Sequence, residues 1–246
     1  MTLTEQIQSL EESKVKTYND GEGTLTGYDC PLCKNRGSIA YLKDGVFTVK
    51  DCECLNRRRS LRRMEASGLK PVLETYTFDN FVTEKDWQKK AKAKAMSFAL
   101  NPSGWFVITG YPGTGKTHLC TAICGFLLEQ NKSIRYMLWR EDAPKIKSCI
   151  TDTEKYNKLM SDYKNCDVLY IDDFWKGSVT DADINLSFEL LNSRYNDRSK
   201  ITILSGERTV EEMLDIDMAI GSRIYELSKG NLIKTPEGVE NNYRLR

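Results

Sequence analysis

The chain has 246 residues, and its 36 basic and 35 acidic side chains leave a formal net charge of only +1. A net charge this small would not attract nucleic acid to the protein as a whole, so any basic contact surface must be local. The single histidine, His118, excludes a two-histidine metal site and a Cys-His hydrolase mechanism. The length suits one domain of ordinary size with a smaller appendage.

The apolar segments and the cysteines indicate in which cellular compartment the protein is expected. Residues 1–16 lack the apolar core of a signal peptide, and no run approaches the length of a membrane span. We therefore expect a soluble intracellular protein with no membrane partner. In a reducing compartment the eight cysteines are expected to be metal ligands or buried small side chains rather than disulfide partners.

The first 54 residues predict a short helix and then a small, turn-rich module. Residues 1–20 carry apolar side chains at helical spacing and end in "NDGEG", a linker signal. Between residues 28 and 54, "SIAYL" and "VFTVK" flank "KDG", and Asp-Gly favours the tight turn of a β-hairpin.

Four cysteines flank that hairpin with the spacing C-x2-C-x18-C-x-C: Cys30, Cys33, Cys52 and Cys54. Two thiolate pairs separated by a hairpin supply the tetrahedral four-sulfur shell that zinc prefers, and a module of about 30 residues could hardly fold without a metal. We therefore predict a structural Zn²⁺. Reduced cysteines and an iron site are the alternatives, and the other four cysteines lack paired ligand spacing.

Two basic stretches follow the cysteine module. "LNRRRSLRRMEASGL" at 55–69 predicts a helix that ends at Gly68, and "KDWQKKAKAK" spans 85–94. Either could contact nucleic-acid phosphates with sequence-independent, salt-sensitive affinity, although most charge runs are solvated faces. The side chains concerned are Arg57, Arg58, Arg59, Arg62 and Arg63 in the first stretch and Lys85, Lys89, Lys90, Lys92 and Lys94 in the second.

From about residue 75 onward, apolar runs alternate with amphipathic helices, which indicates an α/β fold with a sheet wrapped by helices. Strands are expected at 105–110, 133–139, 167–174 and 200–206, and helices at 116–130 and 180–196. The last helix has a start like a capping box at Thr180 and Asp183. One of its faces carries Ile184, Phe188, Leu191 and Tyr195.

"GYPGTGKT" fits the phosphate-loop pattern G-x-x-x-x-G-K-[ST] and lies between a predicted strand and a predicted helix. Its glycines let backbone N–H groups face the phosphates, and the positive end of the helix dipole adds to that field. We expect Lys116 to reach the β- and γ-phosphates of ATP and the Thr117 hydroxyl to ligate Mg²⁺. The predicted nucleotide-binding residues are Gly110, Tyr111, Pro112, Gly113, Thr114, Gly115, Lys116, Thr117 and His118, of which His118 packs near the nucleotide rather than catalysing.

"VLYIDDF" is an apolar strand that ends in two carboxylates. Asp172 is expected to hold the Mg²⁺ through water, and Asp173 to orient or activate the attacking water. Uncompensated buried carboxylates would be costly, so a metal and a phosphate nearby explain them. In "ITILSGE", Ser205 could sense the γ-phosphate with Glu207 close by, although a serine at a strand end is more often a turn former.

The order of these motifs, with "YIDD" at 170–173, "ILSGE" at 203–207 and "AIGSRIYEL" at 219–227, resembles the DnaC/DnaI-type helicase loaders, an AAA+ group shared with the IstB transposition helpers. "YTFDNF" at 76–81 resembles the segment that opens their ATPase domain, and the cysteine module is similar to that of phage-type loaders. The resemblance covers most of the chain. It implies a helicase-interaction region at 1–70, with the zinc module and the basic helix, and an AAA+ P-loop NTPase domain at 71–246.

The resemblance also implies roles and partners. Arg223 in "GSRI" matches the family's arginine finger, which acts on the ATP of a neighbouring copy and so implies self-association through the ATP site. The implied catalytic set is Lys116, Asp172, Asp173, Ser205 and Arg223. The implied function is loading of a replicative DnaB-type helicase onto single-stranded DNA in replication initiation, in the cytoplasm of a bacterial cell or a phage-infected host.

Two features depart from the family pattern. AAA+ proteins usually carry Asp-Glu at this strand end and asparagine or threonine as the first sensor, and the shorter Asp173 indicates slow, regulated hydrolysis. A C-terminal lid is hard to find after Arg223, and Arg244 is a candidate second sensor.

Three other functions remain as alternatives. An IstB-like transposition helper shares the ATPase core, but the cysteine module argues against it. A small-molecule P-loop kinase would need a lid with several arginines. A zinc adaptor with a degenerate nucleotide site conflicts with the intact Lys116, Thr117 and Asp172.

Overall fold

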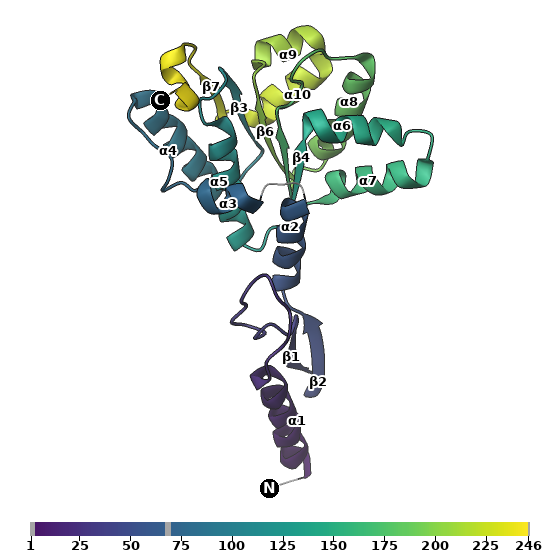
Figure 1. Cartoon of the computed structure of the whole chain (residues 1–246). Helices are drawn as coiled ribbons and strands as arrows, with labels where there is room; N and C mark the ends of the chain where they lie inside the picture. Colours follow the sequence, from purple (N-terminus) through teal and green to yellow (C-terminus); the bar gives the residue numbers. More distant parts are fainter. Residues whose placement is uncertain (1–2, 67–69, 246) are drawn as a thin grey trace. The chain divides into compact units, whose positions relative to one another are not determined.

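The computed structural model describes residues 3–66 and 70–245 of the chain (Figure 1). Two compact units make up the molecule, one up to Arg62 and the other from Arg63 onward. The change of unit falls within a basic helix, α2 (Cys54–Ala66). The domain boundary predicted at residue 70 stays a prediction, and Gly68, the expected end of the basic helix, lies outside the described residues.

The first unit contains a helix and a hairpin. α1 (Leu3–Asp20) precedes the antiparallel strands β1 (Ser38–Lys43) and β2 (Val46–Asp51). Asp44 and Gly45 form the turn with φ angles of 53° and 79°, which is the backbone shape that Asp-Gly favours. The Asn19 side chain bonds both backbone groups of Ala40, at 2.9 Å each, and so ties the helix to the hairpin. The predicted helix and hairpin are confirmed.

A five-stranded parallel sheet forms the centre of the second unit, in the order β4-β5-β6-β3-β7. Its three central strands are almost continuously buried, as expected of a parallel sheet covered on both faces. The sequence predicted four of them and missed the short β7. The strands are β3 (Trp105–Gly110), β4 (Ile134–Leu138), β5 (Val168–Asp172), β6 (Ile201–Gly206) and β7 (Leu232–Thr235).

Helices cover the sheet in two groups. α5 (Lys116–Glu129) packs on β5 and β6, and α3 (Lys70–Thr75) and α4 (Asp86–Leu100) pack on α5. On the other side of the sheet in Figure 1 are α6 (Trp139–Ser148), α7 (Thr153–Asn165), α8 (Asp181–Asn196), α9 (Val210–Ile216) and α10 (Met218–Ser228). Two short 3-10 turns, η1 (Val239–Asn241) and η2 (Tyr243–Leu245), follow β7. Within the described ranges, none of the helices has both the length and the apolar character that crossing a bilayer requires.

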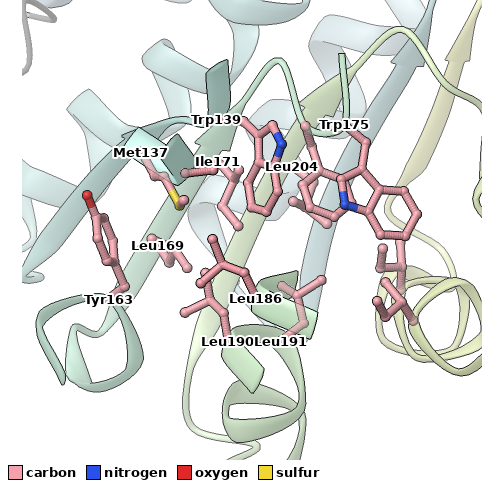
Figure 2. Packing of buried hydrophobic residues seen from close by; sticks show 14 of the residues in the cluster. Met137, Trp139, Tyr163, Leu169, Ile171, Trp175, Leu186, Leu190, Leu191 and Leu204 are labelled. Carbon is pink, nitrogen blue, oxygen red and sulfur yellow. The ribbon is translucent and has the colours of Figure 1, made fainter. Parts of the chain in front are cut away.

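The face of α8 that packs on the core includes three of the four apolar residues that the sequence placed on one face, Ile184, Leu191 and Tyr195. The capping box is present, since the Thr180 hydroxyl accepts from the Asp183 N–H. Leu186, Leu190 and Leu191 are the buried apolar residues of α8, and Figure 2 shows them directed toward the strand residues Ile171 and Leu204. Of the predicted set, only Leu191 is fully buried, whereas Phe188 is 38% exposed. Phe188 instead belongs to a surface shared with α10.

Candidate functional site

The segment between β3 and α5 has the backbone conformation of a phosphate loop. Gly110, Gly113 and Gly115 have φ angles of 114°, 74° and 83°. A Cβ at Gly110 would lie 2.7 Å from the Thr235 carbonyl oxygen, so the packing against β7 requires glycine there. α5 begins directly after this loop at Lys116, and the first N–H groups of a helix have no intrahelical partner and attract anions.

Lys116 lies over the loop. Its Nζ donates to the carbonyl oxygens of Gly110 at 2.9 Å and Tyr111 at 2.8 Å, and the residue is only 8% exposed. Burial lowers the pKa of Lys116, while the nearby carboxylates of Glu207 and Asp173 act to raise it. A cation held between a loop of backbone N–H groups and a cluster of acids is suited to a polyphosphate that carries a metal.

A pocket of about 260 Å³ opens at this loop, and the predicted residues divide into those that line it and those that do not. Pro112, Gly113 and 115–118 line it, whereas the described lining residues do not include Gly110, Tyr111 or Thr114. The buried Thr114 hydroxyl donates to the Tyr111 carbonyl oxygen at 2.8 Å and lies 3.1 Å from the hydroxyl of Thr235. These three residues therefore shape the loop.

Asp172, at the end of β5, is buried and surrounded by hydroxyl groups. Tyr136 donates to its Oδ2 at 3.2 Å, Ser205 donates to its Oδ1, and the Thr117 Oγ1 lies 3.3 Å from both carboxylate oxygens. Burial raises the pKa of Asp172, and the hydrogen bond from Ser205 opposes that rise. A carboxylate and a hydroxyl side by side are oxygen ligands of the kind that Mg²⁺ takes, and a cation would offset the cost of burying the charge.

Asp173 starts the loop that follows β5 and has a φ angle of 53°. Its carboxylate lies 3.2 Å from the Nζ of Lys176, which also lies 2.9 Å from the Glu207 carboxylate. All three side chains line the pocket. Asp173 and Glu207 were predicted from the sequence and Lys176 was missed, because a lysine four residues beyond the end of a strand matches no sequence pattern for a phosphate site.

Aromatic side chains also line the pocket. The His118 ring stacks on Tyr76, with ring centroids 4.6 Å apart and planes at 10°, and Phe81 meets it edge-on at 5.1 Å. The His118 Nε2 lies 2.8 Å from the Thr77 carbonyl oxygen. Burial lowers the pKa of His118, which favours the neutral ring. "YTFDNF" therefore forms one wall of the pocket.

The C-terminal residues form another wall. The Tyr243 N–H donates to the Gly113 carbonyl oxygen at 2.9 Å, and its hydroxyl donates to the Val82 carbonyl oxygen at 2.5 Å. A Cβ on Gly113 would collide with the Asn242 side chain, so the tail packs closely on the phosphate loop. Tyr243 and Arg244 both line the pocket. Arg244 was a candidate from the sequence, and Tyr243 was missed.

Arg223 lies on α10 and is not among the described residues that line the pocket. Its Nε donates to the Asn192 side chain at 3.1 Å, and its Nη1 donates to the Ala219 carbonyl oxygen at 2.8 Å. The guanidinium carbon lies 5.2 Å from the ring centroids of both Phe188 and Tyr195. The side chain is thus held in place on the surface formed by α8 and α10.

The four cysteines of the first unit come together as a buried cluster: Cys30, Cys33, Cys52 and Cys54. Their sulfur atoms all lie within 4.8 Å of one another, with Sγ···Sγ distances of 3.7 Å for Cys30 and Cys52 and 3.5 Å for Cys33 and Cys54. Zinc–sulfur bonds of about 2.3 Å place the sulfur atoms of a tetrahedron about 3.8 Å apart. The cluster therefore fits a four-thiolate zinc site.

The environment of the sulfur atoms differs among the four. Burial acts to raise the pKa of Cys33, but the hydrogen bond from the Gly37 N–H and contacts with the other sulfur atoms lower it to about 7. Burial raises the pKa of Cys52 and Cys54. A divalent cation would favour the thiolate form of all four.

The arginine patch of α2 is smaller than the sequence suggested. Arg58 is 2% exposed and donates to the Thr26 carbonyl oxygen and the Asn35 side chain, at 2.5 and 2.7 Å. Arg57 lies over the Tyr28 ring, 3.9 Å from its centroid. Arg59 and Arg62 are exposed, and the side chain of Arg63 lies outside the described residues. The idea that all five arginines form one contact surface is wrong for Arg58, which holds the cysteine module together.

Comparison with known proteins gives the family. The sequence model of the bacterial DnaA ATPase domain matches residues 72–229. The chain is 29% identical to the phage-like element PBSX protein XkdC of Bacillus subtilis, covering 86% of this chain and 84% of that protein. It is 28% identical to the replicative helicase loader DnaC of Escherichia coli, covering 76% and 78% of the two chains.

The fold is also that of solved structures. A crystal structure of the DnaC helicase loader superposes with a TM-score of 0.58 at 24% identity, covering 68% of this chain and 99% of that one. The chain spans about half the length of the DnaA structures that it matches. The predicted AAA+ core preceded by a small cysteine module is confirmed, as is the resemblance drawn from the motifs. The chain belongs to the family of the bacterial DnaA ATPase domain, and it is similar to the DnaC-type helicase loaders.

Proposed function

We propose that this chain is an ATP-dependent helicase loader, which binds a replicative DnaB-type helicase and helps to place it on single-stranded DNA when replication begins. The observation that carries the proposal is the site around Lys116 and Thr117, which line the pocket, in a chain that is similar over most of its length to a named helicase loader. Asp172 contacts the Thr117 hydroxyl behind that lining and accepts a hydrogen bond from Ser205. This combination joins a triphosphate site to a family whose named members act on a helicase.

The pocket would bind ATP with Mg²⁺. Bound there, Mg²⁺ would neutralise phosphate charge and orient the terminal phosphate. Thr117 and Asp172 would hold the metal, and Lys116 would leave the carbonyl oxygens of Gly110 and Tyr111 for the phosphates. Asp173 would orient the attacking water, and Ser205, which donates to Asp172, would report the state of the site to β6. Hydrolysis would be slow, because aspartate is one carbon shorter than the usual glutamate.

Arg223 would act on a neighbouring copy. Its contacts with Asn192, Ala219 and two aromatic rings hold it on the α8 and α10 surface, where another copy could receive it. A guanidinium brought to a transferring phosphoryl group stabilises its charge and accelerates hydrolysis by orders of magnitude. ATP hydrolysis would then depend on self-association through the ATP site.

The first unit would bind the helicase and carry a structural zinc. Four buried sulfur atoms at zinc spacing support the metal, whose role would be to fold the module. Arg59 and Arg62 on α2, with Lys89 and Lys90 on α4, are exposed cations that could contact DNA phosphates. Such contacts would give salt-sensitive binding without sequence preference.

Partner binding tests the proposal directly. The purified chain is mixed with a DnaB-type helicase, with and without ATP, and the mass of the complex is measured by light scattering. A complex larger than the helicase alone is expected in at least one nucleotide state. Absence of a complex in both states would overturn the loader function.

Two substitutions separate the roles of the nucleotide site. Lys116→Ala should abolish ATP binding, because the phosphates lose their cation. Arg223→Ala should leave ATP binding intact and lose DNA-stimulated hydrolysis. Normal hydrolysis by the Arg223 variant would show that the finger assignment is wrong, even if the loader function stands.

A further inference from the structure

The loop after β5 is held in one conformation next to the phosphate loop. Asp173 and Trp175 have φ angles of 53° and 54°, a region that non-glycine residues seldom adopt and that persists only when the surroundings impose it. Trp175 is 1% exposed and donates from Nε1 to the Ser187 hydroxyl at 2.8 Å. Arg208 donates from Nε to the Trp175 carbonyl oxygen at 2.9 Å. The backbone of Lys176, which follows Trp175, is therefore fixed at the rim of the pocket.

Lys176 joins two strand ends across that rim. Its Nζ lies 3.2 Å from the Oδ2 of Asp173, just after β5, and 2.9 Å from the Oε1 of Glu207, just after β6. The three side chains are between 30% and 34% exposed. Burial acts to lower the pKa of Lys176, but the hydrogen bond to Glu207 and the charge of Asp173 raise it on balance, so the group stays a cation.

The charges around Lys176 indicate which part of a nucleotide would meet it. The pKa of Lys116 responds to Glu207, Asp173 and Lys176, so these groups act on the lysine of the phosphate loop. Lys176 also shares the pocket lining with Lys116 and Thr117. Its partner Asp173 directly follows Asp172, whose carboxylate contacts the Thr117 hydroxyl. Lys176 therefore lies in the part of the pocket where the terminal phosphate of a nucleoside triphosphate would arrive.

The two carboxylates next to Lys176 would repel the terminal phosphate of a triphosphate unless cations offset their charge. Asp173 and Glu207 share one ammonium group, and an ammonium on a flexible stem can move between acceptors at low cost. A phosphate oxygen that approached Lys176 would compete with both carboxylates for the same proton donors. The Asp173 carboxylate would then be free to accept a hydrogen bond from water.

We propose that Lys176 is a binding residue for the terminal phosphate, supplied by the same chain, and that it makes the site prefer nucleoside triphosphates over diphosphates. Lys176 exchanges Asp173 and Glu207 for the terminal phosphate, so Asp173 becomes available for water only when a triphosphate is bound. This inference rests on the proposed nucleotide binding and deepens it. The role is distinct from that of Arg223, which would come from a neighbouring copy.

Nucleotide titrations of the full-length chain test the inference. Affinities for a non-hydrolysable ATP analogue and for ADP, both with Mg²⁺, are measured for the wild type, Lys176→Met and Lys176→Arg. Lys176→Met should weaken binding of the ATP analogue by roughly tenfold or more, the value of a lost charge-assisted hydrogen bond, and ADP binding by less than about twofold. Lys176→Arg should retain most of the preference because it keeps the charge.

Lys145→Met is the matched control. Lys145 forms an ion pair with Asp142 at the same i, i+3 spacing and at 3.0 Å, but it lies on α6 and is not among the residues that line the pocket. The control should change neither affinity. Equal weakening of both nucleotides by Lys176→Met, or no weakening of either, would overturn the inference while leaving the nucleotide site in place. Failure of the wild type to bind either nucleotide would overturn the proposed nucleotide site itself.

Discussion

Arg194 is a fully buried cation on α8 that joins the end of α7 to the start of β6. Its removal is therefore expected to destabilise the second unit strongly. Its Nη1 donates to the carbonyl oxygens of Tyr163, Lys164 and Cys166, each at 3.0 Å, at the end of α7. Its Nη2 donates to the Ile201 carbonyl oxygen at 2.6 Å, and its Nε donates to the Thr202 hydroxyl at 2.9 Å. The last carbonyl groups of a helix have no intrahelical partner, so the guanidinium closes the C-terminal end of α7.

Arg194→Met replaces this donor with an apolar side chain of similar length. At least the three carbonyl groups at the end of α7 would lose their partner in a buried environment, and each costs about 1 kcal/mol or somewhat more. We therefore expect a loss of about 3–4 kcal/mol in the free energy of unfolding. Lys200→Met is the control, because Lys200 donates to the neighbouring Asn165 carbonyl oxygen at 2.8 Å in an exposed position. That change should cost less than about 1 kcal/mol.

Tryptophan fluorescence measures this loss in the second unit alone. All four tryptophans of the chain, at positions 87, 105, 139 and 175, lie in that unit. In urea, with a slope of about 2 kcal/mol per molar, a loss of 3–4 kcal/mol moves the midpoint down by about 1.5–2 M. A midpoint for Arg194→Met that moves no further than the midpoint for Lys200→Met would refute the assignment of Arg194 as the group that closes the helix.

Two further predictions concern the metal and the dependence of stability on pH. The purified chain should contain about one zinc ion per molecule by elemental analysis, and Cys52→Ser should lose it; a metal-free wild type or bound iron would contradict the zinc assignment. Burial acts to raise the pKa of Asp183, but Lys147 and Thr180 lower it on balance. The contribution of the Asp183 carboxylate to the free energy of unfolding is therefore fully present above the unfolded pKa and is lost as the pH falls through the folded pKa. Asp183→Asn should therefore lower the free energy of unfolding by roughly 1–2 kcal/mol at about pH 7, and the difference from the wild type should shrink below about pH 4, measured by the same urea titration; a constant difference would contradict this linkage.

The elements that the sequence predicted correctly are those in which one strong local signal decides the structure. β3, β5 and β6 are long apolar runs bounded by glycine or acidic residues, and the Asp-Gly turn and the capping box of α8 are set by their own side chains. β7 was missed because its four residues include an exposed lysine, and its pairing with β3 depends on residues more than a hundred positions away. Phe188 of α8 is exposed although it shares a helical face with Leu191, because tertiary packing, and not periodicity alone, decides how much of an apolar face is buried.

The site divides in the same way. The phosphate loop and the carboxylates at the end of β5 could be predicted, because a strand followed by a fixed pattern places them at one edge of the sheet. Lys176 and Tyr243 could not, since the first depends on a strained loop and the second on the path of a short tail. Arg58 shows the opposite error, because a run of arginines gives no sign that one of them is buried against the cysteine module.

The contact of Tyr243 with the phosphate loop has a genetic consequence. A stop codon at Asn242 would leave the sheet and all its covering helices encoded, yet it would delete two residues that line the pocket, Tyr243 and Arg244. Such an allele is expected to impair nucleotide binding as a missense mutation in the phosphate loop would. Nonsense and frameshift alleles that act after Asn241 are therefore informative about nucleotide binding.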